Sequence, residues 1–106
     1  MNADTDVSVR DNTERSRFEV LVDGEVVGYS EYSPEGDALA MSHTVVDPAY
    51  EGEGLGSRLV GEALAALRDR GLQVLPYCSF VRGYIQRHEE LRSIVPDDQR
   101  DRFLLS

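Results

Sequence analysis

The apolar pattern of this 106-residue chain changes its period on either side of a short glycine-rich segment, residues 51–56. Before the segment, apolar side chains recur at every second residue, as in Phe18, Val20 and Val22, which is typical of a half-buried strand. After it, apolar residues recur along one helical stripe: Leu55, Leu59, Val60, Ala63, Leu64 and Leu67. The segment therefore joins a strand to a helix, which predicts an α/β fold.

Turn signals divide the rest of the chain into short elements. Asp23-Gly24 predicts a hairpin turn, residues 33–37 form a second turn cluster, and Gly71 is a good helix terminator. The expected order is strand, strand, strand, helix, strand, helix, with strands at 18–22, 25–32, 38–46 and 72–76, one helix from residue 55 and another over 80–91. The strands that flank the first helix should be parallel neighbours joined by a right-handed crossover. An acidic tail after Pro96 is expected to be helical.

Length and composition indicate one globular domain. A chain of 106 residues has room for a single domain, and 41% hydrophobic residues is an ordinary fraction. Residues 1–15 are polar and are expected to form a flexible arm, with the folded domain over 16–106. No apolar run approaches the roughly 20 residues of a membrane span. The first residues lack a basic and apolar leader and the single cysteine forms no internal disulfide, so a cytoplasmic location is expected.

The formal net charge of −9 excludes one class of partner and favours another. The phosphates of a nucleic acid would be repelled. A cationic partner, such as an amine or a basic peptide, would be attracted. The same charge also keeps a protein soluble without any partner, and charge alone does not separate these two interpretations.

The glycine segment has a possible function as an anion site. Gly52, Gly54 and Gly56 allow backbone angles that other residues avoid, so that consecutive amides can converge on one anion. The helix that follows adds unpaired N–H groups and a partial positive charge at its N-terminus. Together these groups could hold a pyrophosphate without a basic side chain. The alternative is a flexible turn that merely needs glycine.

Several motifs along the chain resemble those of the GNAT-type N-acetyltransferases. Val45-Val46 followed by Glu51-x-x-Gly54-x-Gly56 is similar to that family's acetyl-CoA signature, usually written Q/R-x-x-G-x-G/A. The supporting motifs are His43-Thr44-x-Val46, Gly52-x-Gly54-x-Gly56-Ser57, Pro76-x-Cys78-Ser79-Phe80 and Tyr84-Ile85-x-Arg87-His88. The likeness covers residues 18–95 and points to a short single-domain branch of the family with a Pro-x-Cys motif.

The resemblance implies a GNAT-like mixed sheet that splays open between its two parallel strands, with the pantetheine of acetyl-CoA in that cleft. The cofactor-binding residues that it implies are Val45, Val46, Glu51, Gly52, Glu53, Gly54, Leu55, Gly56, Ser57 and Arg87. This chain departs from the family at Glu51, where Arg or Gln is usual, and Glu53 adds a second carboxylate. Repulsion of the pyrophosphate would weaken binding unless these side chains point to solvent, or unless Arg58, Arg82 or Arg87 compensates.

Cys78 is a candidate nucleophile because it lies between a buried strand and a helix. A helix N-terminus stabilises a thiolate, and a thiolate can attack acetyl-CoA and pass the acetyl group to an amine. The resemblance supports this role, since the branch carries a cysteine in this motif. Two alternatives remain: a small buried hydrophobe, or a cleft residue beside direct transfer to the amine.

His43 and Tyr84 are candidates for proton transfer. An amine with a pKa of about 10 must lose a proton before it attacks, and His43 could take it. Strand alternation places His43 on an apolar stripe with Leu39, Met41 and Val45, so a core histidine is an equal alternative. The resemblance suggests that Tyr84 protonates the departing sulfur, although packing is the commoner role of a helix tyrosine. Cys78 and the two histidines have irregular spacing, and no metal site is expected.

The expected function is acetyl-CoA-dependent N-acyl transfer to a small or peptidyl amine by a monomer or weak homodimer. The rival is a non-catalytic acyl-CoA-binding or protein-interaction module with the same fold, because so short a chain has little material for a substrate-binding lobe.

Overall fold

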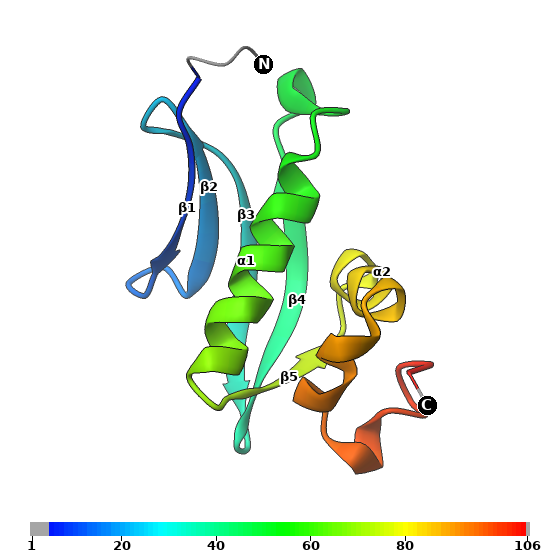
Figure 1. The fold of residues 1–106 in the computed structure, drawn as a ribbon. Coiled ribbons are helices and arrows are strands. Elements are labelled where there is room, and N and C mark those ends of the chain that lie inside the picture. The colour runs from blue at the N-terminus through cyan, green and yellow to red at the C-terminus, as the bar shows by residue number, and fades with distance from the viewer. Residues whose placement is uncertain (1–4, 106) are drawn as a thin grey trace.

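The computed structural model describes residues 5–105 and shows a mixed five-stranded sheet with its strands in chain order (Figure 1). The strands are β1 (Val7–Asn12), β2 (Arg17–Val22), β3 (Glu25–Glu35), β4 (Ala38–Val46) and β5 (Gln73–Pro76). Strands β1 to β4 pair antiparallel, and β5 pairs parallel with β4, from Ala38 opposite Gln73 to Met41 opposite Pro76. The expected α/β fold with a mixed sheet is confirmed, and the sheet has one strand more than predicted.

Strand β1 corrects the prediction of a flexible arm over residues 1–15. Residues 7–12 pair with β2, and the two valines of β1 pack against the core. The first four residues of that arm lie outside the described part of the chain. Arg10 Nε and Arg17 Nε each donate to the carboxylate of Glu19 over 2.8 Å. Burial alone would raise the pKa of Glu19, but these hydrogen bonds outweigh it and lower that pKa. Arg10 and Asn12 of β1 thus help to hold a buried charge in β2.

The turn between β2 and β3 forms where it was predicted. Asp23 and Gly24 both have positive φ, at 50° and 84°, as a type I′ hairpin turn requires. The next turn is tighter than predicted, because β3 continues through residues 33–35 and pairs with β4 as far as Glu35 opposite Ala38.

A bulge in β4 decides which way its carboxyl-terminal residues face. Glu31 pairs with His43 but Tyr32 pairs with Met41, so Ser42 is an extra residue in β4. One extra residue inverts the alternation of side chains. Met41 is therefore fully buried in the core, whereas His43 is exposed. The prediction that these two residues share an apolar stripe is wrong for this reason.

Helix α1 (Leu55–Asp69) covers one face of the sheet (Figure 1). All six residues of the predicted helical stripe are buried, none more than 3% exposed. Burying each large aliphatic side chain contributes about 1.5–3 kcal/mol, so this stripe anchors the helix. Gly71 follows the helix in a left-handed conformation with φ 74°, which confirms its role as a terminator.

Helix α2 (Ser79–Arg87) begins directly after β5 and is shorter than the predicted 80–91. His88 ends it: Nδ1 of His88 donates to the carbonyl of Tyr84 over 2.8 Å, and the backbone N–H of His88 donates to Ile85 instead. The chain continues in short 3₁₀ turns, Glu89–Ile94 and Asp97–Gln99, rather than in a helical tail. Neither helix of the described chain is long and apolar enough to cross a membrane.

Candidate functional site

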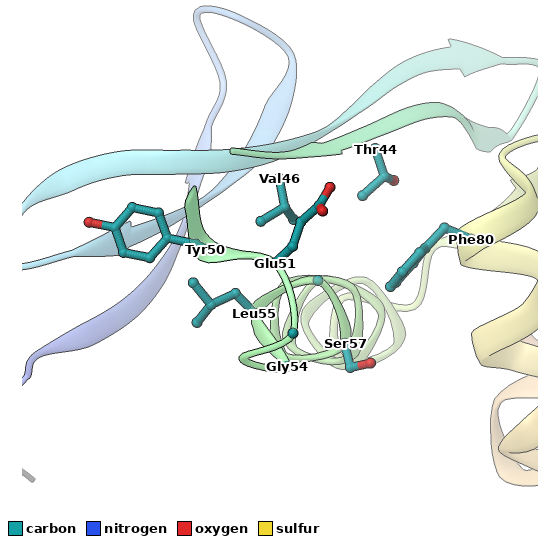
Figure 2. A pocket seen from close by; sticks show the side chains of 10 residues that line it. Thr44, Val46, Tyr50, Glu51, Gly54, Leu55, Ser57 and Phe80 are labelled. Atoms are coloured by element: carbon teal, nitrogen blue, oxygen red, sulfur yellow. The ribbon is translucent and has the colours of Figure 1, made fainter. Parts of the chain in front are cut away.

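A cavity of about 350 Å³ opens where the end of β4, the glycine segment and the starts of both helices meet (Figure 2). Its lining residues are Thr44, Val46, Tyr50, Glu51, Gly52, Gly54, Leu55, Gly56, Ser57 and Phe80. Seven of the ten predicted cofactor-binding residues are among them, all except Val45, Glu53 and Arg87. The sequence thus predicted most of the wall of this cavity.

Gly52 and Gly54 have the conformational role that the sequence predicted. Both are left-handed, with φ 83° and 76°, which strains any other side chain. A Cβ atom added at either position would meet no atom within 4 Å. The path of the backbone therefore requires these two glycines. Because no atom lies near the position of an added Cβ, this surface of the loop is open to a ligand.

Gly56 has a different role from the other two glycines. It is the second residue of α1 and has no positive φ. A Cβ atom there would lie 2.9 Å from Cζ of Phe80, so Gly56 is required by packing between α1 and α2. The Phe80 ring is 41% exposed and forms the wall of the cavity on the side of α2 (Figure 2).

The start of α1 presents backbone donors to the cavity. Its N-cap is Gly54, which has no side chain to cap the helix. The first helical hydrogen bond runs from Arg58 N–H to the Gly54 carbonyl over 3.1 Å. The amides of residues 55–57 precede that bond and have no carbonyl one turn back to receive them. With the helix dipole, these amides form a site that favours an anion.

Glu51 is the charged residue among those that line the cavity. Its side chain reaches from the loop toward the Val46 side of the cavity (Figure 2). Arg58 does not face it, because Arg58 binds Glu62 over 2.7 Å and the Val7 carbonyl over 3.0 Å. The predicted repulsion between Glu51 and an anionic ligand is therefore not offset by Arg58.

Cys78 is linked to the cavity through Thr44. Cys78 is the N-cap of α2 and is partly exposed. Its Sγ–H donates to Oγ1 of Thr44 over 3.4 Å. The hydroxyl of Thr44 lies 2.9 Å from that of Ser30, which is fully buried in β3. Cys78 is thus neither an isolated core residue nor a free surface thiol.

His43 and Val45 lie on the opposite face of β4 from Thr44, because neighbouring strand residues alternate. The His43 ring is edge-on to the ring of Tyr29, with centroids 6.4 Å apart. The side chain of Val45 lines a separate hollow on that face, together with Tyr29 and Arg17. The structure does not bring these side chains into the cavity.

Tyr84 and Arg87 also lie outside the lining of the cavity. The Tyr84 ring stacks on His88 at 4.0 Å, and its hydroxyl would be 2.5 Å from a Cβ atom added at Gly61 of α1. Arg87 is exposed in the last turn of α2. The geometry therefore shows packing contacts for Tyr84, and a catalytic role for it stays a prediction.

Three lining residues had no role in the sequence interpretation: Thr44, Tyr50 and Phe80. Thr44 could have been found, since it lies two residues before Val46 and shares its face of the strand. Phe80 lies in the Pro76-x-Cys78-Ser79-Phe80 motif, but the motif does not place its ring in the cavity. The positions of Phe80 and Tyr50 depend on how α2 and the turn after β4 pack.

Comparison with known proteins identifies the family. The sequence profile described as GCN5-related N-acetyl-transferase matches residues 17–94, most of the 106-residue chain. The chain belongs to this family. The match runs from β2 to the 3₁₀ turn Glu89–Ile94, and so includes the whole glycine segment and Cys78.

Individual members of the family are similar over parts of their length. A mycothiol acetyltransferase of Nocardia farcinica is 51% identical over 45 residues, which are 42% of this chain and 15% of that protein. A Brucella melitensis GNAT acetyltransferase, solved in complex with acetyl-CoA, has a TM-score of 0.52 and 30% identity, over 64% of this chain and 50% of that one. The Escherichia coli ribosomal-protein-S18-alanine N-acetyltransferase has a TM-score of 0.53 at 17% identity, over 66% of this chain and 64% of that one. The last likeness shows the fold alone.

Within residues 5–105, no three His, Cys, Asp or Glu side chains are grouped so that they could hold a metal ion.

Proposed function

We propose that this protein is an N-acetyltransferase that binds acetyl-CoA in the cavity at the start of α1. The observation that carries the proposal is the open helix N-terminus, where left-handed Gly54 leaves the amides of residues 55–57 facing a cavity of about 350 Å³. Family membership and the Brucella melitensis structure with acetyl-CoA support the same ligand.

The residues of the cavity fit the chemistry of coenzyme A. Backbone amides of residues 55–57 suit a pyrophosphate, which needs donors and positive potential. Val46 and Phe80 offer apolar surface to a pantetheine chain. Acetyl-CoA supplies the activated acetyl thioester, and this chain's own residues bind it, orient it and position the groups beside it. We infer that the pyrophosphate lies against the start of α1 and that the acyl end lies toward Thr44 and Cys78.

Two routes of acetyl transfer are open to this arrangement. In one, Cys78 takes the acetyl group and passes it to the amine; in the other, the amine attacks the thioester directly and Cys78 only lines the path. We propose the first, because the hydrogen bond to Thr44 connects the Cys78 sulfur to the cavity wall. His43 stays a predicted base, and it would have to act from the opposite face of β4.

The acceptor is proposed to be a small or peptidyl amine, consistent with the net charge of −9. The rival proposal is a module that binds acyl-CoA without catalysis. Its support is the acidic loop, in which Glu51 lines the cavity and Glu53 adds a second carboxylate.

Incubation with acetyl-CoA and a panel of amines, read by mass spectrometry of the products, separates the two proposals. A transferase yields acetylated amine and free CoA in equal amounts. Binding of acetyl-CoA without turnover across small amines, polyamines and basic peptides would favour the non-catalytic module.

A further inference from the structure

Three side chains beside the cavity form one hydrogen-bonded chain: Cys78, Thr44 and Ser30. They come from the start of α2, from β4 and from β3. We propose that Thr44, held by Ser30, is a positioning residue that orients the Cys78 sulfur and stabilises it as a thiolate. The application to acyl transfer rests on the proposed function, but the hydrogen-bonded chain itself does not.

The direction of these hydrogen bonds depends on the state of the sulfur. A thiol donates to Thr44 Oγ1, as the distance of 3.4 Å allows. A thiolate can only accept, so the Thr44 hydroxyl must then donate to the sulfur. Thr44 Oγ1 is thereby left as an acceptor, and the Ser30 hydroxyl, 2.9 Å away, can donate to it. Ser30 is fully buried, so water does not compete for its hydroxyl.

The backbone holds the sulfur and the threonine at this separation. The N–H of Cys78 donates to the carbonyl of Met41 over 2.9 Å, which ties the start of α2 to β4. The Cys78 side chain makes no capping hydrogen bond to its own helix. Its sulfur is therefore directed to Thr44 across the two elements, and Thr44 in turn lines the cavity.

The proposed first step moves the acetyl group from the sulfur of CoA to the sulfur of Cys78. The Cys78 thiolate forms a bond to the acetyl carbonyl carbon, the bond from that carbon to the CoA sulfur breaks, and the proton that the thiol had released to water is taken up by the departing CoA sulfur. The products are free CoA and acetyl-cysteine. The amine then displaces the Cys78 sulfur, which recovers a proton from the amine.

Alkylation of the thiol by iodoacetamide, without any cofactor, tests the proposal. Cys78 is the single cysteine of the chain, so labelling reports this sulfur alone. Because a hydrogen bond to a charged group is strong, Thr44→Val should slow alkylation at neutral pH about tenfold and move its pH profile to higher pH. Thr44→Ser should restore the wild-type rate and profile, and Ser30→Ala should fall between them. Ser33→Ala, an exposed hydroxyl on the same strand as Ser30, is the control.

Wild-type rate and pH profile in a folded Thr44→Val protein would overturn the proposal. If that variant does not fold, Ser30→Ala decides in its place: an unchanged profile overturns the proposal and a shifted one supports it. In another outcome, alkylation of Cys78 slows in Thr44→Val as expected, but the wild-type protein acetylates no amine. This outcome would support the hydrogen-bonded chain and would count against the proposed function alone.

Discussion

The Glu51 side chain works against the site that its neighbours build. The amides at the start of α1 favour an anion, yet a carboxylate lies in the wall of the same cavity. At a partly exposed site, one such charge changes a binding free energy by roughly 0.5–1 kcal/mol. A glutamate in this position therefore lowers affinity for a phosphate ligand without abolishing it.

Glu51→Gln should strengthen the binding of CoA roughly two- to fivefold, because it removes that repulsion and keeps the shape of the side chain. Isothermal titration at low and high salt measures the effect, which should shrink as salt screens the charge. Glu53→Gln is the matched control: the same charge is removed from an exposed residue that does not line the cavity, and the gain should be smaller. Equal or weaker binding by Glu51→Gln would contradict the placement of the phosphates.

Gly54→Ala should weaken CoA binding at least tenfold while the domain stays folded. The added Cβ meets no atom, so its effect comes from the strained φ of 76°, which costs roughly 1–2 kcal/mol and shifts the loop. Gly36→Ala provides the control, since Gly36 is also left-handed, with φ 59° and open space, but lies in the β3–β4 turn. The site is supported if the two variants lose similar free energy of unfolding but only Gly54→Ala loses affinity for CoA. Equal affinity for CoA in both variants would show that the glycine segment is only a turn and does not bind the ligand.

At the level of whole elements, β1 is held to the rest of the sheet partly by one tyrosine. The Tyr32 hydroxyl donates to Oδ1 of Asp11 over 2.6 Å. Burial, and then the hydrogen bond to Asp11, raise the pKa of Tyr32 from 10.0 to about 12. The folded protein therefore keeps this proton to higher pH than the unfolded chain does. The resulting stability is fully present below pH 10 and is lost as the pH rises toward 12.

Urea denaturation between pH 8 and pH 12 should show that loss in the wild type and a smaller loss in Tyr32→Phe. The variant should also be about 1 kcal/mol less stable at pH 8, because it lacks the hydrogen bond to Asp11. Parallel stability curves for the two proteins over this pH range would show that Tyr32 does not hold β1 in this way.

The contact between α1 and α2 depends on a small residue facing a large one. The Tyr84 hydroxyl would lie 2.5 Å from a Cβ atom at Gly61, so Gly61→Ala should destabilise the protein by about 1–3 kcal/mol. Tyr84→Phe removes the clashing oxygen, and the double variant should recover part of that loss. A thermodynamic cycle from chemical denaturation measures the coupling. Additive single effects would show that the helices do not meet at this point.

Across the molecule, regular patterns were predictable and irregular ones were not. The helical stripe of α1 and the Asp23-Gly24 turn follow from local spacing, and the structure confirms both. Strand β1 was missed because it is rich in polar residues, two of which donate hydrogen bonds to the buried Glu19 of β2. The face of His43 was wrong because the bulge at Ser42 leaves no mark in the apolar pattern. The glycine segment that lines the cavity was predictable, whereas the opposite wall of the cavity, at Phe80, depends on how α2 packs.

The central claim is that acetyl-CoA binds between the start of α1 and the end of β4. A ¹⁵N-labelled sample of this 11.8 kDa protein, titrated with acetyl-CoA and followed by amide NMR, tests the claim directly. The largest saturable shifts should fall on residues 52–57, Val46 and Phe80, while the amides of residues 36–38, at the other end of β4, stay nearly unchanged. Shifts that gather around residues 36–38 instead, or none at saturating concentration, would contradict it.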